Sequence, residues 1–358
     1  MRIYRGGGSE VLYLYPSGVP GGSRGTGAEY GKRAESAVNG MTGGSDRSER
    51  NNRRFGSVFN GMVNGPKKEV STMIKDYKDK KVVVTGAANG IGRELALGCA
   101  KRGADVLAVD IHGDEADAVA AEIKALGREG IALQADVSLP EECQKIFDRA
   151  MEAFGRCDML INNAGVSTGA DVWDIKEDDI KWVTEVNVYS HWYMMKRFVP
   201  QMRKQGTHCQ ILNVCSIAGL ITLGSAPAYF STKHAAVALS EVVYKSLRAA
   251  GDDIDVSVFC PGFVQTEMHL TDRHRPARYA IDPEDPYYNS EAYRKFIAYN
   301  KQILDNGAPL IPTIEKVFEE LENDQFFILT HDQYDRLLRE QGVYQADMVR
   351  PIDPSLLK

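Results

Sequence analysis

Residues 81–103 have the sequence KVVVTGAANGIGRELALGCAKRG, and this stretch decides the fold. It opens with a short β-branched run, which is typical of a strand buried on both faces of a parallel sheet. Three glycines follow at a G-x-x-x-G-x-G spacing, and apolar residues then recur at helical intervals up to a glycine stop. The stretch therefore predicts a strand, a tight turn and a helix in direct succession.

The same alternation continues toward the C-terminus. Short connections between successive strands and helices imply right-handed parallel crossovers. We therefore predict an α/β fold, with a Rossmann-like doubly wound parallel sheet flanked by helices on both faces, in a single domain over residues 76–345. Further strands are predicted at 104–110, 131–137, 157–165, 210–216, 255–262 and 325–330, with helices at 113–127, 141–155, 178–204 and 228–250.

The glycine turn after the first strand has the composition of a phosphate-binding loop. Glycine lets the backbone pass close beneath a pyrophosphate, and the following helix N-terminus offers unpaired N–H groups and a positive dipole end to the anion. A merely tight turn would also use glycine, but the position between strand and helix favours phosphate binding. The expected contacts of this turn are Gly86, Asn89, Gly90, Ile91 and Gly92.

Asp110 ends the second predicted strand. A carboxylate at this position accepts hydrogen bonds from an adenosine ribose diol and repels a 2′-phosphate. The two residues that follow supply no arginine for such a phosphate, and Asn89 stands where a basic residue would be needed. The sequence therefore favours NAD over NADP. Asp136 and Val137, at the end of the third strand, are expected to flank the adenine, although Asp136 would equally serve as a loop cap.

Tyr229 and Lys233, in the sequence YFSTK, stand four residues apart on a predicted helix and so share one face. Tyrosine ordinarily ionises at about pH 10, and a neighbouring Lys⁺ favours the phenolate that a proton-accepting tyrosine needs. The pair alone would also suit an exposed helix surface. Ser216 ends a predicted strand, where α/β sheets bind ligands, but would otherwise cap a helix.

Five motifs stand in order: TGAANGIG at 85–92, NNAG at 162–165, NVCSIAG at 213–219, YFSTK at 229–233 and PG at 261–262. Together they resemble the short-chain dehydrogenase/reductase (SDR) family over about residues 76–265. The resemblance implies an NAD(P)-dependent enzyme that acts on CH–OH groups, assembled as a homodimer or homotetramer.

The resemblance also implies roles for particular residues. Tyr229 would be the proton-transferring residue, Lys233 would assist it and hold the nicotinamide ribose, and Ser216 would hold the substrate oxygen. Asn187 would support a water that relays protons to the lysine, although it would also suit backbone pairing in a kinked helix. The remaining expected cofactor contacts are Asn163, which would also pin neighbouring strands, and Ala164, Gly165, Pro261, Gly262, Val264 and Thr266.

The first 72 residues differ in composition from the rest. Residues 1–75 carry 12 Lys and Arg against 6 Asp and Glu, whereas the whole chain has a net charge of −6. Gly-, Ser- and Arg-rich stretches without periodicity do not bury enough apolar surface to order themselves. We expect a disordered extension over 1–72. A misassigned start codon, with Met62 or Met73 as the true start, an inert tail and a functional tail are its three interpretations.

Composition excludes several classes of protein. The acidic balance, with a pI of about 5.7, argues against nucleic acid as a partner. Six cysteines without CxxC or Cys/His ligand spacing predict reduced core thiols and no metal site. No apolar run is long enough to span a membrane, and no clear signal core is present, so a cytoplasmic location is expected.

Residues 267–307 are long for a loop in this fold, which suits a substrate lid. Six aromatic residues in it favour an apolar or ring-bearing substrate such as a sterol, terpenoid or aromatic alcohol, unless they pack against the body of the protein. Three arginines, Arg273, Arg275 and Arg278, would alternatively bind an acidic substrate group.

We therefore predict an NAD-dependent oxidoreductase that interconverts a secondary alcohol and a ketone. An NADP-dependent carbonyl reductase and a non-catalytic dinucleotide-binding scaffold are the alternatives.

Overall fold

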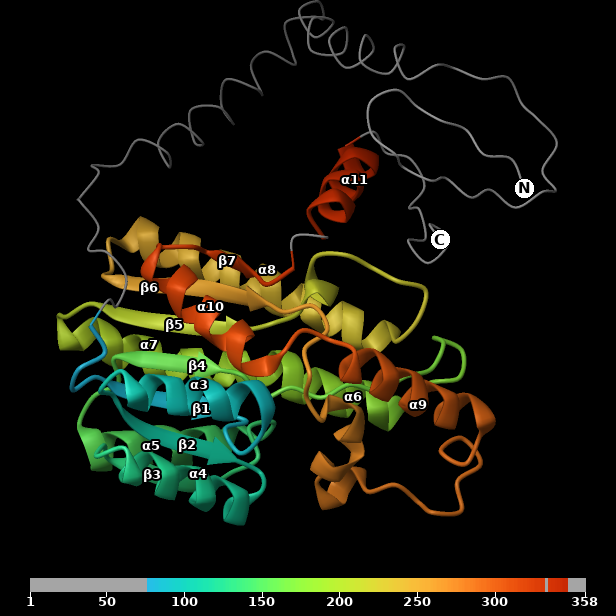
Figure 1. Cartoon of the computed structure of the whole chain (residues 1–358), viewed down its shortest axis with the longest axis horizontal. Helices are drawn as coiled ribbons and strands as arrows, with labels where there is room; N and C mark the ends of the chain where they lie inside the picture. Colours follow the sequence, from blue (N-terminus) through green and yellow to red (C-terminus); the bar gives the residue numbers. More distant parts are fainter. Residues whose placement is uncertain (1–75, 332–333, 347–358) are drawn as a thin grey trace, which may run out of the picture. The chain divides into compact units, whose positions relative to one another are not determined.

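Among the described residues, seven strands form one fully parallel sheet with the order β3-β2-β1-β4-β5-β6-β7 (Figure 1). The computed structural model describes residues 76–331 and 334–346, so the predicted extension over 1–72 lies outside the described residues. The strands are β1 Lys81–Thr85, β2 Asp105–Asp110, β3 Gly130–Gln134, β4 Met159–Asn162, β5 Cys209–Val214, β6 Ile254–Cys260 and β7 Phe327–Leu329.

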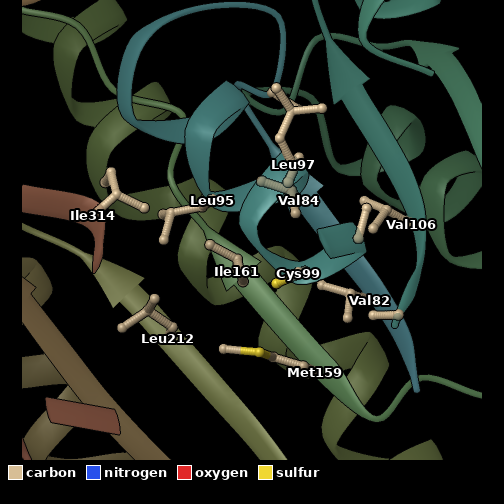
Figure 2. Close-up of a cluster of buried hydrophobic side chains, with 14 of the residues drawn as sticks. Val82, Val84, Leu95, Leu97, Cys99, Val106, Met159, Ile161, Leu212 and Ile314 are labelled. Carbon is tan, nitrogen blue, oxygen red and sulfur yellow. The ribbon is translucent and has the colours of Figure 1, made fainter. Parts of the chain in front are cut away.

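Alternate side chains of β1 enter opposite faces of the sheet, as a strand buried on both faces requires. Val82 and Val84 pack with Leu95 and Ile314 on one face (Figure 2), while Val83 joins the core on the other face. The first face is covered by α3 Gly90–Lys101, α4 Gly113–Ala125 and α10 Leu310–Glu322. The second is covered by α5 Pro140–Phe154, α7 Ser190–Gln205 and α8 Pro227–Ala250. The predicted doubly wound sheet is confirmed.

The chain winds outward from β1 to β3 and then crosses back to form β4 on the other side of β1. This reversal creates a crevice at the carboxyl ends of β1 and β4, where open α/β sheets bind their ligands. The functional residues predicted above follow these strand ends, so the topology gathers them at one edge of the sheet.

The helix predicted at 178–204 is interrupted by one π-helical turn. It consists of α6 Glu177–Thr184, the π-turn η1 Glu185–Tyr189 and α7. A π-turn holds one extra residue and is frequently found at functional sites. Asn187 lies in this turn. The apolar spacing on either side does not reveal the extra residue, so the sequence predicted an unbroken helix.

Residues 267–307 fold into short elements: η3 Met268–His274, η4 Ala277–Tyr279 and α9 Glu291–Asp305. A β-bridge between Val264 and Ala308 closes the base of this segment. Two ring pairs lie 4.8 and 5.2 Å apart, Tyr287 with Tyr288 and Tyr288 with Tyr293. These three aromatics therefore pack against one another, which favours the alternative that the segment's aromatics are structural.

All six cysteines are buried and free, as predicted for core thiols. No helix in the described part of the chain has the length and apolarity needed to cross a membrane. The remaining described helices are the 3₁₀ turn η2 Ile217–Gly219, which follows β5, and α11 Tyr334–Ala346.

Candidate active site

A cleft lies at the carboxyl ends of the central strands and brings together nearly all of the predicted site residues. Of that set, Gly92 and Asn187 do not line it. The predicted residues on its wall are Gly86, Asn89, Gly90, Ile91, Asp110, Asp136, Val137, Asn163, Ala164, Gly165, Ser216, Tyr229, Lys233, Pro261, Gly262, Val264 and Thr266. Further lining residues that the sequence did not single out are Ile111, Ala135, Val166, Trp182, Val186, Val214 and Cys215. The predicted lid segment 267–307 also contributes lining residues, namely Glu267, Met268, Thr271, His274 and Leu304.

The three glycines of the β1–α3 turn have different reasons to be glycine. Gly86 has φ +62°, and a Cβ on it would lie 2.8 Å from Ala164 Cα. A Cβ on Gly92 would lie 2.0 Å from the Gly86 carbonyl oxygen. Both therefore serve the packing of the turn itself. Gly90, with φ +53°, lines the cleft, and a Cβ there would meet nothing closer than Thr266 at 3.4 Å.

The turn fits a bound phosphate group. No side chain caps the first turn of α3 and no acidic residue stands in it. The Asn89 amide donates instead to Glu267 Oε2 at 2.8 Å. The positive end of the α3 dipole therefore faces the cleft, where it would attract the negative charge of a phosphate. Gly90 has no side chain that would keep the phosphate away from the backbone N–H groups.

Asn163 holds β1 and β4 together beside this turn, as predicted. Its Nδ2 donates to the carbonyl oxygens of Thr85 and Gly86 at 3.0 and 2.9 Å. Thr85, which the sequence did not single out, accepts at its Oγ1 from the backbone N–H groups of Asn163 and Ala164. These hydrogen bonds hold the ends of β1 and β4 together, and all of the groups that form them are neutral.

Asp110 lies in the cleft wall at the end of β2, and its carboxylate is held by backbone groups. Its two oxygens accept from the N–H groups of Ala88 and His112, each at 3.0 Å. His112 Nε2 in turn lies 2.9 Å from His274 Nδ1, so a histidine from the distant segment η3 borders the same corner. These three side chains bring potential metal-ligating atoms within 4.8 Å of one another.

Asp136 serves as a loop cap and also lies in the cleft wall. It caps its own loop by accepting from the Ser138 N–H at 3.0 Å, and it lines the cleft next to Val137. Its second oxygen forms an ion pair with Arg278 at 2.7 Å. This part of the cleft wall is therefore tied to the segment that follows β6.

The three arginines of that segment are each paired with carboxylates. Arg273 pairs with Glu115 and Glu267, and Arg278 pairs with Asp136 and Glu185. Arg275 is 3% exposed and pairs with Asp179 and Asp272. Their charges are compensated within the protein, so the alternative that they bind an acidic substrate group is not supported.

Tyr229 and Lys233 project from α8 into the same cleft. Lys233 is 2% exposed, its Nζ donates to the Val214 carbonyl oxygen at 3.3 Å and it lies 5.7 Å from the centre of the Tyr229 ring. Burial excludes an exposed surface pair. The two side chains therefore face each other inside the protein, as their shared helical face predicts.

Ser216 lies at the end of β5 and also borders the cleft. Its Oγ accepts from the Ala218 N–H at 3.1 Å, so it caps the short turn η2 as well. Cys215, its neighbour, lines the cleft too, but burial raises the pKa of that thiol to about 11. Of the two adjacent side chains, the serine is therefore the one suited to polar contact with a substrate oxygen.

Asn187 does not line the cleft and is fully buried. Its Oδ1 accepts from the Val166 N–H, and its Nδ2 donates to the Val166 carbonyl and to Thr232 Oγ1, at 2.9, 2.9 and 3.1 Å. Both N–H groups of its amide are thus used within the protein. Its observed contacts fit the structural interpretation, and Thr232 places it one residue from Lys233.

The cleft wall carries apolar as well as polar side chains. The apolar ones that the sequence did not single out include Val166, Trp182, Val186, Met268 and Leu304. None of the six aromatic residues noted between 267 and 307 is among the lining residues in the described part of the chain.

Comparison of the sequence and the fold with known proteins identifies the family. The sequence profile of the family described as short chain dehydrogenase matches residues 80–277. The chain belongs to this family. It is accordingly an NAD(P)-dependent dehydrogenase/reductase that acts on CH–OH groups.

Two curated relatives and one solved structure illustrate the similarity. A CLA biosynthesis dehydrogenase/reductase of Lactiplantibacillus plantarum is 42% identical over 268 residues, which cover 75% of this chain and 93% of the relative. A 1-deoxy-11-beta-hydroxypentalenate dehydrogenase of Streptomyces exfoliatus is 35% identical, covering 53% of this chain and 69% of the relative. The crystal structure of an SDR from Burkholderia phymatum in complex with NAD superposes with a TM-score of 0.74 at 30% identity, covering 78% of this chain and 98% of that one.

Proposed function

We propose that this SDR is an NAD-dependent oxidoreductase that interconverts a secondary alcohol and a ketone on an apolar small molecule. The observation that carries the proposal is the meeting of Ser216, Tyr229 and Lys233 in one cleft with the glycine turn of α3. The cofactor supplies the hydride-transfer chemistry when bound, and the protein supplies orientation and the proton path.

The proton path starts at Tyr229. During oxidation the alcohol O–H proton moves to the Tyr229 oxygen, and in the reverse direction Tyr229 returns it to the ketone oxygen. Ser216 donates to the same substrate oxygen and holds it beside Tyr229. Lys233, held by the Val214 carbonyl, stabilises the phenolate by its charge. Asn187 positions Lys233 indirectly, through Thr232 and Val166.

Asp110 supports NAD rather than NADP. Its carboxylate lines the cleft, and no arginine lines it in the described part of the chain. A 2′-phosphate there would meet a negative charge with no cation facing it, whereas a ribose diol would donate to the carboxylate. The solved structure from Burkholderia phymatum holds NAD, which agrees with this choice.

The apolar side chains in the cleft wall support an apolar or ring-bearing substrate. A site of this kind binds by burial of hydrocarbon surface, with a few polar groups fixing orientation. A sterol, terpenoid or aromatic alcohol fits this description. The relative from Streptomyces exfoliatus is named for a hydroxylated substrate, which is consistent with a CH–OH group as the reacting centre.

A homodimer or homotetramer is proposed through the helices that bear Asn187 and Tyr229. Three large apolar side chains are exposed: Tyr189 at the end of η1, Trp192 in α7 and Val242 in α8, at 45, 54 and 59%. Their burial between two copies would remove apolar surface from water. Light scattering on the purified protein measures the assembly, and a monomer would contradict it. A cytoplasmic location remains a prediction.

The proposed function is tested by following NADH formation with a panel of sterols, terpenols and aryl alcohols. We expect turnover with at least one secondary alcohol and a higher kcat/KM with NAD than with NADP. Better efficiency with NADP would favour the NADP-dependent carbonyl reductase. Bound NADH without turnover of any alcohol or ketone would favour the dinucleotide-binding scaffold.

A further inference from the structure

Residues 267–279, which we call the clasp segment, run past the carboxyl ends of several strands (Figure 1, orange). Near its start, Glu267 accepts from the amide of Asn89 in the glycine turn after β1. Thr271, which is buried, accepts at its Oγ1 from the Ser167 N–H beyond β4 at 3.1 Å. The segment therefore bridges the two sides of the crevice between β1 and β4.

The next residues of the clasp segment reach the region that follows β2. Arg273 Nη2 donates to both carboxylate oxygens of Glu115, in the first turn of α4, at 2.5 and 2.6 Å. His274 Nδ1 lies 2.9 Å from His112 Nε2, and His274 lines the cleft together with Asp110. Burial lowers the pKa of His274, which favours the neutral ring that a direct His–His hydrogen bond needs.

The end of the clasp segment reaches the region that follows β3. Arg278 forms ion pairs with Asp136 at 2.7 Å and with Glu185 at 3.3 Å, and it also donates to Ser138. Tyr279 donates its hydroxyl proton to Glu185 at 3.0 Å. Along its length the segment thus contacts the ends of β1, β2, β3 and β4, which is the path a dinucleotide follows in this class of sheet.

The anchors of the clasp segment fall into two kinds. Arg275 is 3% exposed and is held by Asp179 and Asp272 in a buried cluster. Arg273 and Arg278 are 30 and 34% exposed. Ion pairs of the exposed kind are individually weak, about 0–1 kcal/mol, and open readily. The segment therefore has one fixed point and two that can release.

We propose that residues 267–279 close over the bound dinucleotide and retain it, with His274 a further cofactor-binding residue on the Asp110 side of the cleft. The segment thereby serves the cofactor in addition to, or in place of, the substrate. The proposal rests on the dinucleotide binding of the proposed function, but not on any turnover. Cofactor release then requires the exposed anchors to open.

The test is the dissociation rate of NADH, measured by stopped-flow fluorescence after displacement with excess NAD⁺. Arg273→Gln and Glu115→Gln should each raise the rate about fivefold, as expected when a pair of the exposed kind is lost. The double variant should exceed Arg273→Gln by little, because Arg273→Gln already removes the pair with Glu115. Arg294→Gln, an exposed position on α9 with the same change of charge, should leave the rate unchanged.

His274→Ala provides an independent arm, since it removes a cleft-lining ring without changing an ion pair. It should also raise the NADH dissociation rate, and hydrogen exchange at 268–279 should slow when NADH is added to the wild type. Unchanged dissociation in both Arg273→Gln and His274→Ala would overturn the proposal. So would a wild type that binds neither NADH nor NADPH. Bound NADH without turnover would contradict the oxidoreductase proposal alone, and the dissociation rates would still decide the role of the segment.

Discussion

The two halves of the cleft are held by different interactions. Around Tyr229 the supporting groups are buried and bonded to the backbone: Lys233 donates to the Val214 carbonyl, and Asn187 bonds to both backbone groups of Val166. Near the ends of β2 and β3, by contrast, residues 273–278 are held by exposed ion pairs of Arg273 and Arg278. Buried hydrogen bonds to the backbone fix a geometry, whereas exposed ion pairs are weak and screened by salt. The difference suits chemistry at one end and exchange of cofactor at the other.

The largest effect is expected at the catalytic end. Tyr229→Phe should lower kcat roughly 10³-fold, because the proton-transferring hydroxyl is lost. NADH affinity should change little, since the ring and Lys233 remain. Steady-state kinetics and NADH fluorescence titration measure the two quantities. Tyr244→Phe, which removes a hydroxyl from the same helix outside the cleft, is the control. Retained activity in Tyr229→Phe would remove that residue from the mechanism.

Loss of Arg275, the buried anchor of the clasp segment, should lower the free energy of unfolding much more than loss of an exposed ion pair. Burial opposes the charge of Arg275, yet Asp179 and Asp272 outweigh this and hold the pKa of Arg275 above its usual value. Arg275→Met leaves the fully buried Asp179 uncompensated and should lower the free energy of unfolding by roughly 3 kcal/mol or more.

The matched control for Arg275→Met is Lys245→Met. Lys245 forms an exposed pair with Glu241 one helical turn away on α8, and its loss should change the stability by at most about 0.5 kcal/mol. Denaturant unfolding at pH 7 compares the two variants. Equal stability in Arg275→Met and Lys245→Met would contradict the claim that Arg275 is the fixed point of the clasp segment.

A buried histidine near the catalytic end should make the fold sensitive to acid. His191 is 1% exposed, and neither ring nitrogen has a hydrogen-bond partner among the described residues. Burial, with a smaller effect of the Lys233 charge, lowers the pKa of His191 to about 3. The unfolded chain takes up this proton below pH 6.5 and the folded protein does not, so stability falls as the pH drops from 6.5 toward 3.

When the pH drops from 7 to 5, His191 should lower the free energy of unfolding by about 2 kcal/mol. His191→Leu should therefore reduce the loss of unfolding free energy over that interval, without lowering stability at pH 7 by a comparable amount. Denaturant unfolding at both pH values gives the difference. Identical pH dependence in the variant and the wild type would show that His191 does not titrate as inferred.

The smallest of these effects is expected in the choice of cofactor. Asp110→Ser removes the charge that faces a 2′-phosphate and should shift the ratio of kcat/KM for NAD and NADP about tenfold toward NADP. Asp114→Ser, at a nearby exposed position of α4, carries the same change of charge as a control. An unchanged ratio in Asp110→Ser would place the discrimination elsewhere in the cleft.

The features that could be predicted from the sequence are those set by local spacing. A β-branched run followed by glycines at 86, 90 and 92 specifies a strand, turn and helix, and the four-residue spacing of Tyr229 and Lys233 specifies a shared helical face. Alternation of such units fixes the doubly wound sheet. These signals are contained in a few consecutive residues, so no long-range contact is needed to recognise them.

The closure of the cleft could not be predicted in this way. Arg273 pairs with a residue 158 positions earlier, and His274 with one 162 positions earlier. Neither spacing leaves a periodic signal. The aromatic residues of 267–307 suggested an apolar or ring-bearing substrate, but Tyr287, Tyr288 and Tyr293 pack against one another. The π-turn at Asn187 could not be predicted either, because its one extra residue leaves the helical spacing of apolar residues intact on both sides of it.

The central claim is that the cleft separates proton transfer from cofactor retention. Its most direct test is a side-by-side measurement of Tyr229→Phe and Arg273→Gln, with the hydride-transfer step followed in a single turnover at 340 nm and NADH dissociation followed by displacement. We predict that Tyr229→Phe slows the first step roughly 10³-fold and leaves the second unchanged, while Arg273→Gln speeds the second about fivefold and leaves the first unchanged. If both substitutions alter the same step, the two halves of the cleft do not act separately.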